Sequence, residues 1–208
     1  MKSVQRLTQR RFSEAVRELA HRDSDIKAIV ERIGAPKPIY RQPGFASLAY
    51  IILEQQVSLA SAKSTFEKLT LQTGPFTPTA LLDLDDENLR SAGVSRQKAR
   101  YLRVLARAVC DGTLFLEELE RQSDEQVRAE LTALTGIGDW TADVYLLMAL
   151  RRPDLWPVGD LALVKAVGEI KGLSPRPDPS QLNSLGESYR PYRSVATRLY
   201  WHHYLNPE

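Results

Sequence analysis

The spacing of apolar residues is the feature that most constrains how this chain can fold. Apolar side chains recur every three or four residues, as at Leu102, Leu105, Ala106 and Val109. No segment shows a clear alternation of apolar and polar residues. A period near 3.6 gathers apolar side chains on one face of an α-helix, whereas a half-buried strand needs a period of two. The sequence therefore predicts an all-α protein. Helices are expected at about residues 9–21, 23–33, 44–55, 58–71, 95–111, 123–133, 139–150, 160–171 and 191–205.

Capping residues agree with these boundaries. Ser123 followed by Gln126 fits a capping box, and Asp23 and Ser95 stand where N-caps are expected. Glycines that can end helices lie at positions 34, 74, 112 and 172. Residues 172–186 carry three prolines at alternate positions, so we expect a connector there before the final helix.

Length, charge and cysteine content narrow the class of protein. A chain of 208 residues with 43% hydrophobic composition can form one substantial core or two lobes, and we expect a single globular domain over 1–208. The net charge of +2 means that any nucleic-acid face must be a local patch. Cys110 is the single cysteine, which excludes an intramolecular disulfide and a four-cysteine iron–sulfur cluster. The single cysteine also favours an intracellular protein. Because no apolar stretch is long enough to span a membrane, we expect no membrane contact, and we expect a monomer.

Residues 123–150 have the pattern helix, five-residue turn LTGIG, helix. Gly136 and Gly138 can adopt positive φ and let another backbone approach closely. A helix that begins near Asp139 directs free N–H groups and the positive end of its dipole outward, which can hold a phosphate without a basic side chain. The alternative is an ordinary tight connection between two helices, and the Asp139 carboxylate would repel a phosphate if it faced one.

The stretches LTGIGDWTAD and WPVGDLAL resemble the helix-hairpin-helix (HhH-GPD) DNA glycosylases, most closely the alkylation-repair branch of the 3-methyladenine DNA glycosylase II type. RQPGFASLAYIILEQQVSLASA, AGVSRQKARYLRVLARAV and RPYRSVATRLYW agree in the same order, so the resemblance covers roughly 41–205. It implies a two-lobed helical fold with a cleft between the lobes. It also implies that the β-rich N-terminal domain of larger relatives is absent, because too few residues precede the matching region.

The resemblance places the family's essential aspartate on Asp160. A fixed carboxylate stabilises the positive charge that develops on the sugar when an N-glycosidic bond breaks, or orients the attacking water. The alternative role for Asp160 is the N-cap of the helix that follows it, and the two roles can coexist. Members that also cleave the DNA backbone carry a lysine where this chain has Trp140, so the resemblance implies no lyase activity; Lys165, the nearby amine, is not expected to replace that lysine.

Trp140 and Trp201 match positions that line the base pocket in the alkyladenine branch, where a tryptophan face attracts a positively charged methylated purine. Core packing is the alternative for both. The family's pocket tyrosine falls on Val144, with Tyr145 beside it. Gln56 matches the wedge residue that fills the gap left by a flipped base. Contacts with the DNA backbone are implied for Gly136, Ile137, Gly138, Thr141, Arg193 and Ser194.

Together these matches imply a monofunctional glycosylase that removes alkylated purines such as 3-methyladenine from double-stranded DNA and leaves an abasic site. No organic cofactor and no side-chain metal ligand are expected, although hairpin carbonyls hold a monovalent cation in this family. Two alternatives stay open: a glycosylase for a deaminated or oxidised base, with or without lyase activity, and a non-catalytic helix-hairpin-helix protein that only binds DNA.

Overall fold

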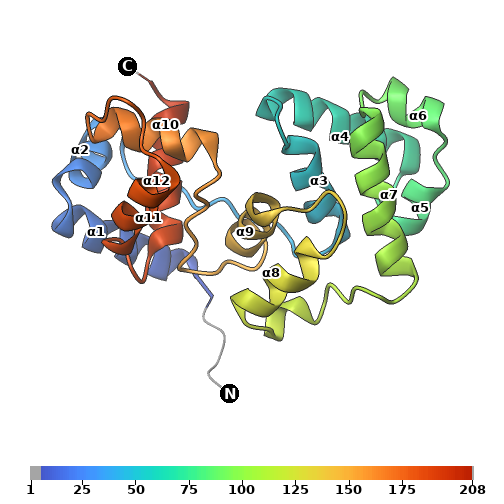
Figure 1. Ribbon diagram of the computed structural model, residues 1–208, viewed down its shortest axis with the longest axis horizontal. Coiled ribbons are helices and arrows are strands. Elements are labelled where there is room, and N and C mark those ends of the chain that lie inside the picture. Colours follow the sequence, from blue (N-terminus) through green and yellow to red (C-terminus); the bar gives the residue numbers. More distant parts are fainter. Residues whose placement is uncertain (1–5, 208) are drawn as a thin grey trace. The chain divides into compact units, whose positions relative to one another are not determined.

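The computed structural model describes residues 6–207, and the regular elements in that range are all helices (Figure 1). They are α1 (Gln9–Arg22), α2 (Ser24–Ile33), α3 (Phe45–Glu54), α4 (Leu59–Thr73), α5 (Pro78–Leu82), α6 (Asp86–Ser91), α7 (Arg96–Cys110), the 3₁₀ turn η1 (Leu119–Arg121), α8 (Asp124–Thr132), α9 (Asp139–Met148), α10 (Leu161–Ile170), α11 (Pro179–Glu187) and α12 (Arg193–Leu205). The predicted all-α class is confirmed. Within the described range, none of these helices is both long and apolar enough to cross a lipid bilayer.

The chain divides into two compact units. The first combines the N-terminal part of the chain up to Tyr40 with the segment from Leu146 onward, and the second is Arg41–Tyr145. Helix α9 begins in the second unit and ends in the first. The single domain expected over 1–208 stays a prediction.

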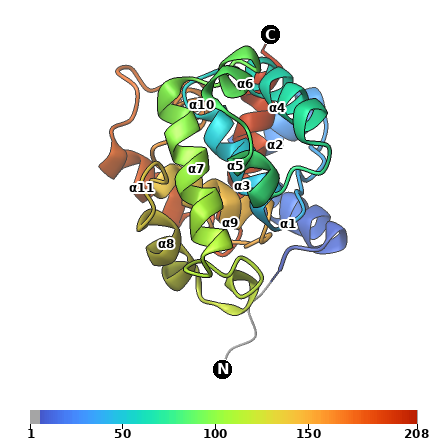
Figure 2. The same cartoon turned by 90° about the vertical axis from the view of Figure 1, so that its right-hand side faces the viewer.

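In the second unit, α7 is the helix against which the others assemble. It packs on α3, α5 and α6, and α4 packs on α3 (Figure 2). Helix α3 is apolar on nearly all sides, as expected for a helix surrounded by protein, and its Leu48, Ile51 and Ile52 are fully buried. Leu102 and Leu105 of α7, predicted from their spacing to face a core, are fully buried as well.

In the first unit, α12 is the helix against which the others assemble. It packs on α10, α2 and α1, so helices from the N-terminal and C-terminal parts of the chain share one core. Leu19 of α1, Ile26 of α2 and Leu199 of α12 are fully buried. A polar cluster also lies inside this unit: Asp23 accepts hydrogen bonds from the Tyr189 hydroxyl and the Lys171 ammonium, each at 2.9 Å.

The expected boundaries and caps are largely confirmed. Asp23, Ser95 and Ser123 are N-caps, and Ser123 forms the predicted capping box with Gln126. The connector expected over 172–186 is wrong in its second half, because α11 begins at Pro179. The short helices α5 and α6 were not predicted from the sequence either.

Candidate functional site

The turn between α8 and α9 has the tight backbone that its glycines predict. Gly136 has a φ of +98°, and a Cβ added there would overlap the ring of Tyr101. Glycine is therefore required at 136 both for its backbone conformation and for the close approach of the Tyr101 ring. Gly138 differs: its φ lies outside the positive region, and a Cβ built there meets no atom within 4 Å. The open space at Gly138 leaves this side of the turn accessible.

Thr141 stands in the first turn of α9 and is buried, with 1% of its surface exposed. Its hydroxyl oxygen accepts a hydrogen bond from Nε2 of Gln55 at 2.9 Å, and the same Nε2 donates to the carbonyl oxygen of Gly136 at 2.9 Å. The predicted contact between the Thr141 hydroxyl and a DNA phosphate would therefore share this oxygen with Gln55. Ile137, also predicted to contact DNA, has a buried side chain, so only its backbone can make such a contact.

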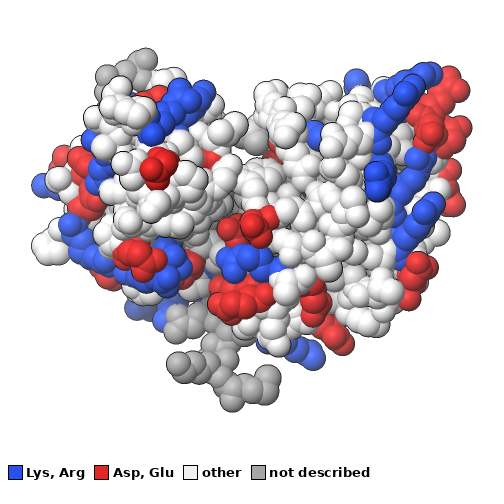
Figure 3. Space-filling view, viewed as in Figure 1, with Lys and Arg blue, Asp and Glu red and all other residues white. Residues whose placement is uncertain are grey.

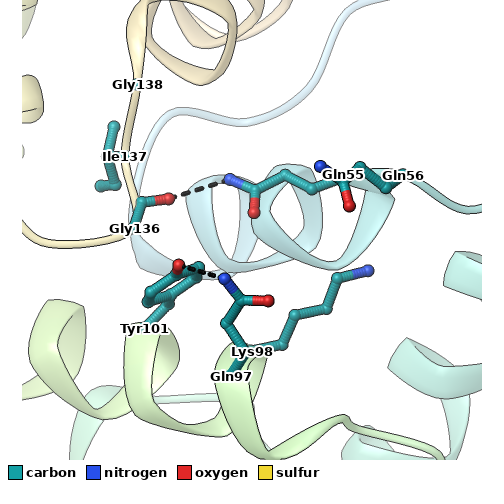
Figure 4. A pocket seen from close by; sticks show the side chains of 8 residues that line it. All are labelled: Gln55, Gln56, Gln97, Lys98, Tyr101, Gly136, Ile137 and Gly138. Atoms are coloured by element: carbon teal, nitrogen blue, oxygen red, sulfur yellow. Dashed lines mark hydrogen bonds between the residues drawn. The ribbon is translucent and has the colours of Figure 1, made fainter.

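A cavity of about 400 Å³ opens beside the turn (Figure 4). The turn supplies one wall, the segment directly after α3 supplies Gln55 and Gln56, and α7 supplies Gln97, Lys98 and Tyr101. The Lys98 ammonium donates to the carbonyl oxygen of Leu53 at 2.6 Å, and burial lowers the pKa of this ammonium. The lining is polar and carries one cation.

Gln56, the predicted wedge, is exposed and lines this cavity. Its φ is +57°, a backbone conformation that is uncommon outside glycine and that marks constrained segments. An exposed side chain on a constrained backbone suits insertion into DNA, and the wedge role stays a prediction.

Asp160 is the N-cap of α10, as the alternative interpretation of the sequence expected. Its Oδ1 accepts a hydrogen bond from the backbone N–H of Leu163 at 2.7 Å and another from the indole Nε1 of Trp201 at 2.9 Å. Asp160 and Trp201 are 8% and 7% exposed. The structure thus brings these two predicted site residues into direct contact within the first unit, and the two donors fix one carboxylate oxygen in place.

The other predicted pocket residues differ in exposure. Trp140 is partly exposed in the first turn of α9, whereas Val144 and Tyr145 are buried, at 2% and 0% exposed. The Tyr145 hydroxyl accepts a hydrogen bond from the backbone N–H of Gly44 at 2.9 Å, and burial raises the pKa of this hydroxyl to about 12. Tyr145 therefore joins α9 to the start of α3, and its role in a base pocket stays a prediction.

Arg193 and Ser194, predicted to contact the DNA backbone, have partners inside the first unit. The Arg193 guanidinium forms a two-pronged ion pair with the Asp154 carboxylate, with both nitrogen–oxygen distances at 2.9 Å. Ser194 is 2% exposed, and its hydroxyl oxygen accepts a hydrogen bond from the backbone N–H of Leu155 at 2.9 Å. Phosphate contacts by these two side chains would compete with bonds that anchor the start of α12.

The cation implied by the resemblance would rest on hairpin carbonyls. The carbonyl oxygens of Leu134, Gly136 and Gly138 each accept an N–H bond, from Ile137, Gln55 and Ala142 respectively. Among residues 6–207, no group of three or more His, Cys, Asp or Glu side chains is arranged to hold a metal. Binding of a cation by the hairpin stays a prediction.

Sequence reasoning missed two residues around the turn: Gln55 and Tyr101. The signal for Gln55 was the change from the apolar run of α3 to polar residues just before Ser58, the N-cap of α4. Tyr101 carried no signal, because Gly136, against which its ring packs, lies 35 positions further along the sequence.

A sequence model of the HhH-GPD superfamily of base excision DNA repair proteins matches residues 49–191. The chain is 28% identical to DNA-3-methyladenine glycosylase 1 of Schizosaccharomyces pombe over 91% of this chain and 86% of that protein. It is 30% identical to a putative DNA-3-methyladenine glycosylase of Bacillus subtilis over 72% of this chain, but it spans only 55% of that protein.

Among solved structures, the fold is similar to a 3-methyladenine DNA glycosylase of Schizosaccharomyces pombe in complex with abasic DNA. The TM-score is 0.85 at 28% sequence identity, and the match covers 90% of this chain and 95% of that one.

Proposed function

Because the chain belongs to the HhH-GPD superfamily of base excision DNA repair proteins, we propose that it is a DNA glycosylase that removes alkylated purines such as 3-methyladenine. It acts as a monomer on double-stranded DNA that carries the damaged base. The observation that carries the proposal is the Asp160 carboxylate, which is fixed at the start of α10 by two N–H donors, one of them the Trp201 indole. The names of the similar proteins support the substrate class.

The reaction breaks the bond between C1′ of the sugar and the ring nitrogen of the base. A purine methylated at N3 or N7 is positively charged, so it takes the bonding electron pair and leaves as a neutral base. The sugar then gains oxocarbenium character, and the Asp160 carboxylate stabilises this charge and orients a water toward C1′. The water oxygen bonds to C1′ and its proton passes to solvent, which leaves an abasic site. No strong general acid is needed.

Different residues bind the extruded base and the DNA backbone. The extruded base stacks on tryptophan, for which Trp140 and Trp201 are the candidates, and a cationic base adds about 0.5–2 kcal/mol through cation–π attraction. The turn from Gly136 to Gly138 approaches the DNA backbone through N–H groups other than that of Ile137, which already donates to the Leu134 carbonyl oxygen at 3.1 Å. Gln56 fills the space that the base leaves.

Replacement of Asp160 by asparagine tests the catalytic role. The asparagine side chain keeps the N-cap and the size of the aspartate but removes the charge, so the fold should survive. Two unit charges about 4 Å apart attract by about 4 kcal/mol at an effective dielectric constant of about 20, so the rate of base release should fall roughly a thousandfold. The measurement is single-turnover release of 3-methyladenine from duplex DNA, followed by mass analysis of the released base.

Asp178→Asn is the matched control, because Asp178 is the N-cap of α11 and forms a capping box with Gln181. It should keep the wild-type rate. Release of methylated bases by a folded Asp160→Asn variant at the wild-type rate would show that the mechanism is wrong.

We also propose that the protein has no lyase activity. A lyase needs an amine that attacks C1′, and Trp140 stands where related lyases carry lysine. Lys165 lies one turn into α10, with its ammonium 5.7 Å from the centre of the Tyr204 ring. Incubation with damaged DNA and borohydride should therefore trap no covalent protein–DNA adduct. An adduct that disappears in a Lys165→Met variant would instead identify that lysine as a nucleophile.

A further inference from the structure

The end of α3 and the turn between α8 and α9 are far apart in the sequence but are joined by one side chain. Gln55 directly precedes the predicted wedge, Gln56, and forms the C-cap of α3. Its Nε2 donates to the carbonyl oxygen of Gly136 and to the hydroxyl of Thr141, both at 2.9 Å (Figure 4 shows the first of these). A single carboxamide thus contacts both the turn and the first turn of α9.

We propose that Gln55 is a positioning residue that couples the wedge to the DNA-holding turn. The inference rests on the proposed function, since a wedge and a phosphate-holding turn have a purpose only on DNA. The backbone of Gln56 is held at positive φ, and the residue directly before it is tied to the turn and to α9 by the two hydrogen bonds of the Gln55 side chain. When the turn holds the strand, the bonds of Gln55 fix where Gln56 stands relative to that strand.

Helix α7 supports both partners of this link. Lys98 donates to the carbonyl oxygen of Leu53, two residues before Gln55, at 2.6 Å. Tyr101, one turn further along α7, packs so closely on Gly136 that a Cβ there would overlap its ring. Because both residues lie on one helix, the end of α3 and the turn have a common rigid support. The carboxamide of Gln55 adds a direct link between the end of α3 and the turn.

Catalysis depends on such alignment, because a displacement of about 1 Å away from the reacting atoms can lower a rate by about 100-fold. Gln55→Met preserves length and volume and removes both hydrogen bonds. It should lower the single-turnover release of 3-methyladenine from duplex DNA by about 10- to 100-fold.

The matched control is Gln72→Met. Gln72 also donates Nε2 to one backbone carbonyl and one hydroxyl, those of Asn88 and Ser91, but it joins α4 to α6. Its substitution should change the release rate by less than about twofold.

A coupling measurement separates positioning from simple structural support. Gln56→Ala removes the wedge and Gly138→Ala obstructs the turn, and each should weaken binding to duplex DNA that carries a stable abasic-site analogue. If the wedge and the turn act together, each substitution should weaken DNA binding about fivefold less when the other is already present than it does in the wild-type protein. This coupling should disappear in the Gln55→Met background and persist in the Gln72→Met background.

Coupling that is unchanged by Gln55→Met, or release that stays within about twofold of wild type, would overturn the inference. The outcome is distinct from failure of the proposed function. A wild-type protein that binds abasic DNA without releasing methylated bases would contradict the proposed activity, while the binding measurements would still decide whether Gln55 couples wedge and turn. A wild-type protein that binds neither abasic-site DNA nor methylated duplex DNA would overturn both the proposed function and the role of Gln55.

Discussion

At the scale of single residues, replacement by alanine should affect stability strongly at one glycine of the turn and hardly at all at the other. Gly136→Ala should destabilise the protein by more than about 2 kcal/mol, because its φ is positive and the added Cβ would overlap the Tyr101 ring. Gly138→Ala should change the free energy of unfolding by less than about 0.5 kcal/mol, because its Cβ meets no atom within 4 Å. Urea unfolding of both variants measures this difference. Equal stability of the two variants would contradict the arrangement of Tyr101 against the turn.

The candidate site shows how far sequence can reach for individual residues. Asp160 and Trp201 were both found by resemblance, and the N-cap role of Asp160 followed from the helix pattern. The hydrogen bond between them did not, because it joins residues 41 positions apart and depends on how α12 packs on α10. Gln55 was missed for the same reason: its partners lie in a turn more than eighty residues away.

At the scale of secondary structure elements, α11 shows where a local pattern misled. Prolines at alternate positions favour a connector, yet Pro179 occupies the first turn of α11, where a missing backbone N–H costs nothing. Asp178 and Gln181 form a capping box that starts the helix at this point. The capping box therefore predicts α11 more reliably than the prolines predict a connector. The short helices α5 and α6 span too few residues for periodicity to be detected.

The start of α2 predicts a dependence of stability on pH. Burial alone raises the pKa of the Asp23 carboxyl, but hydrogen bonds from Lys171, the backbone of Ile26 and Tyr189 together lower that pKa below its ordinary value. A carboxyl whose pKa is lower in the folded state stabilises the protein above the ordinary pKa of about 3.9. This stabilisation is lost as the pH falls through the folded-state pKa.

The variant Asp23→Asn should therefore be less stable than wild type at pH 6, by about 1 kcal/mol because partial exposure screens the charge. The difference should shrink between about pH 4 and pH 2 as the wild-type carboxyl becomes protonated. Thermal unfolding across this range is the measurement, with Asp178→Asn as the N-cap control outside the cluster. A difference that stays constant with pH would mean that the Asp23 charge does not stabilise the fold.

At the scale of the whole molecule, the helical class and most helices followed from periodicity, whereas the division into units did not. The first unit is discontinuous in sequence and depends on contacts such as the 2.9 Å bond between Lys171 and Asp23, which are 148 positions apart. A succession of helices with apolar and polar faces does not reveal which of them share a core. Resemblance to a family supplied the expectation of two lobes, whereas length and composition alone favoured a single globular domain.

The distribution of charge over the molecule determines how strongly salt should weaken DNA binding. On the side of Figure 3 where α6 and α7 lie, Asp and Glu border a band of Lys and Arg, and the net charge of the protein is only +2. Backbone N–H groups of the turn add no cationic side chain. Each phosphate neutralised by lysine or arginine contributes about −0.9 to the slope of log K against log salt, so we expect a shallow slope, no steeper than about −4.

The same reasoning separates backbone contacts from charged contacts. Gly138→Ala should weaken binding to abasic-site DNA by a similar factor at every salt concentration, because it obstructs the turn without removing a charge. Loss of a lysine or arginine that contacts a phosphate would instead make the slope shallower by about 1. Fluorescence anisotropy titrations between 50 and 300 mM salt, roughly the range over which such slopes are resolved, measure both quantities. A slope that changes by about 1 in Gly138→Ala would mean that the turn acts through a charged side chain.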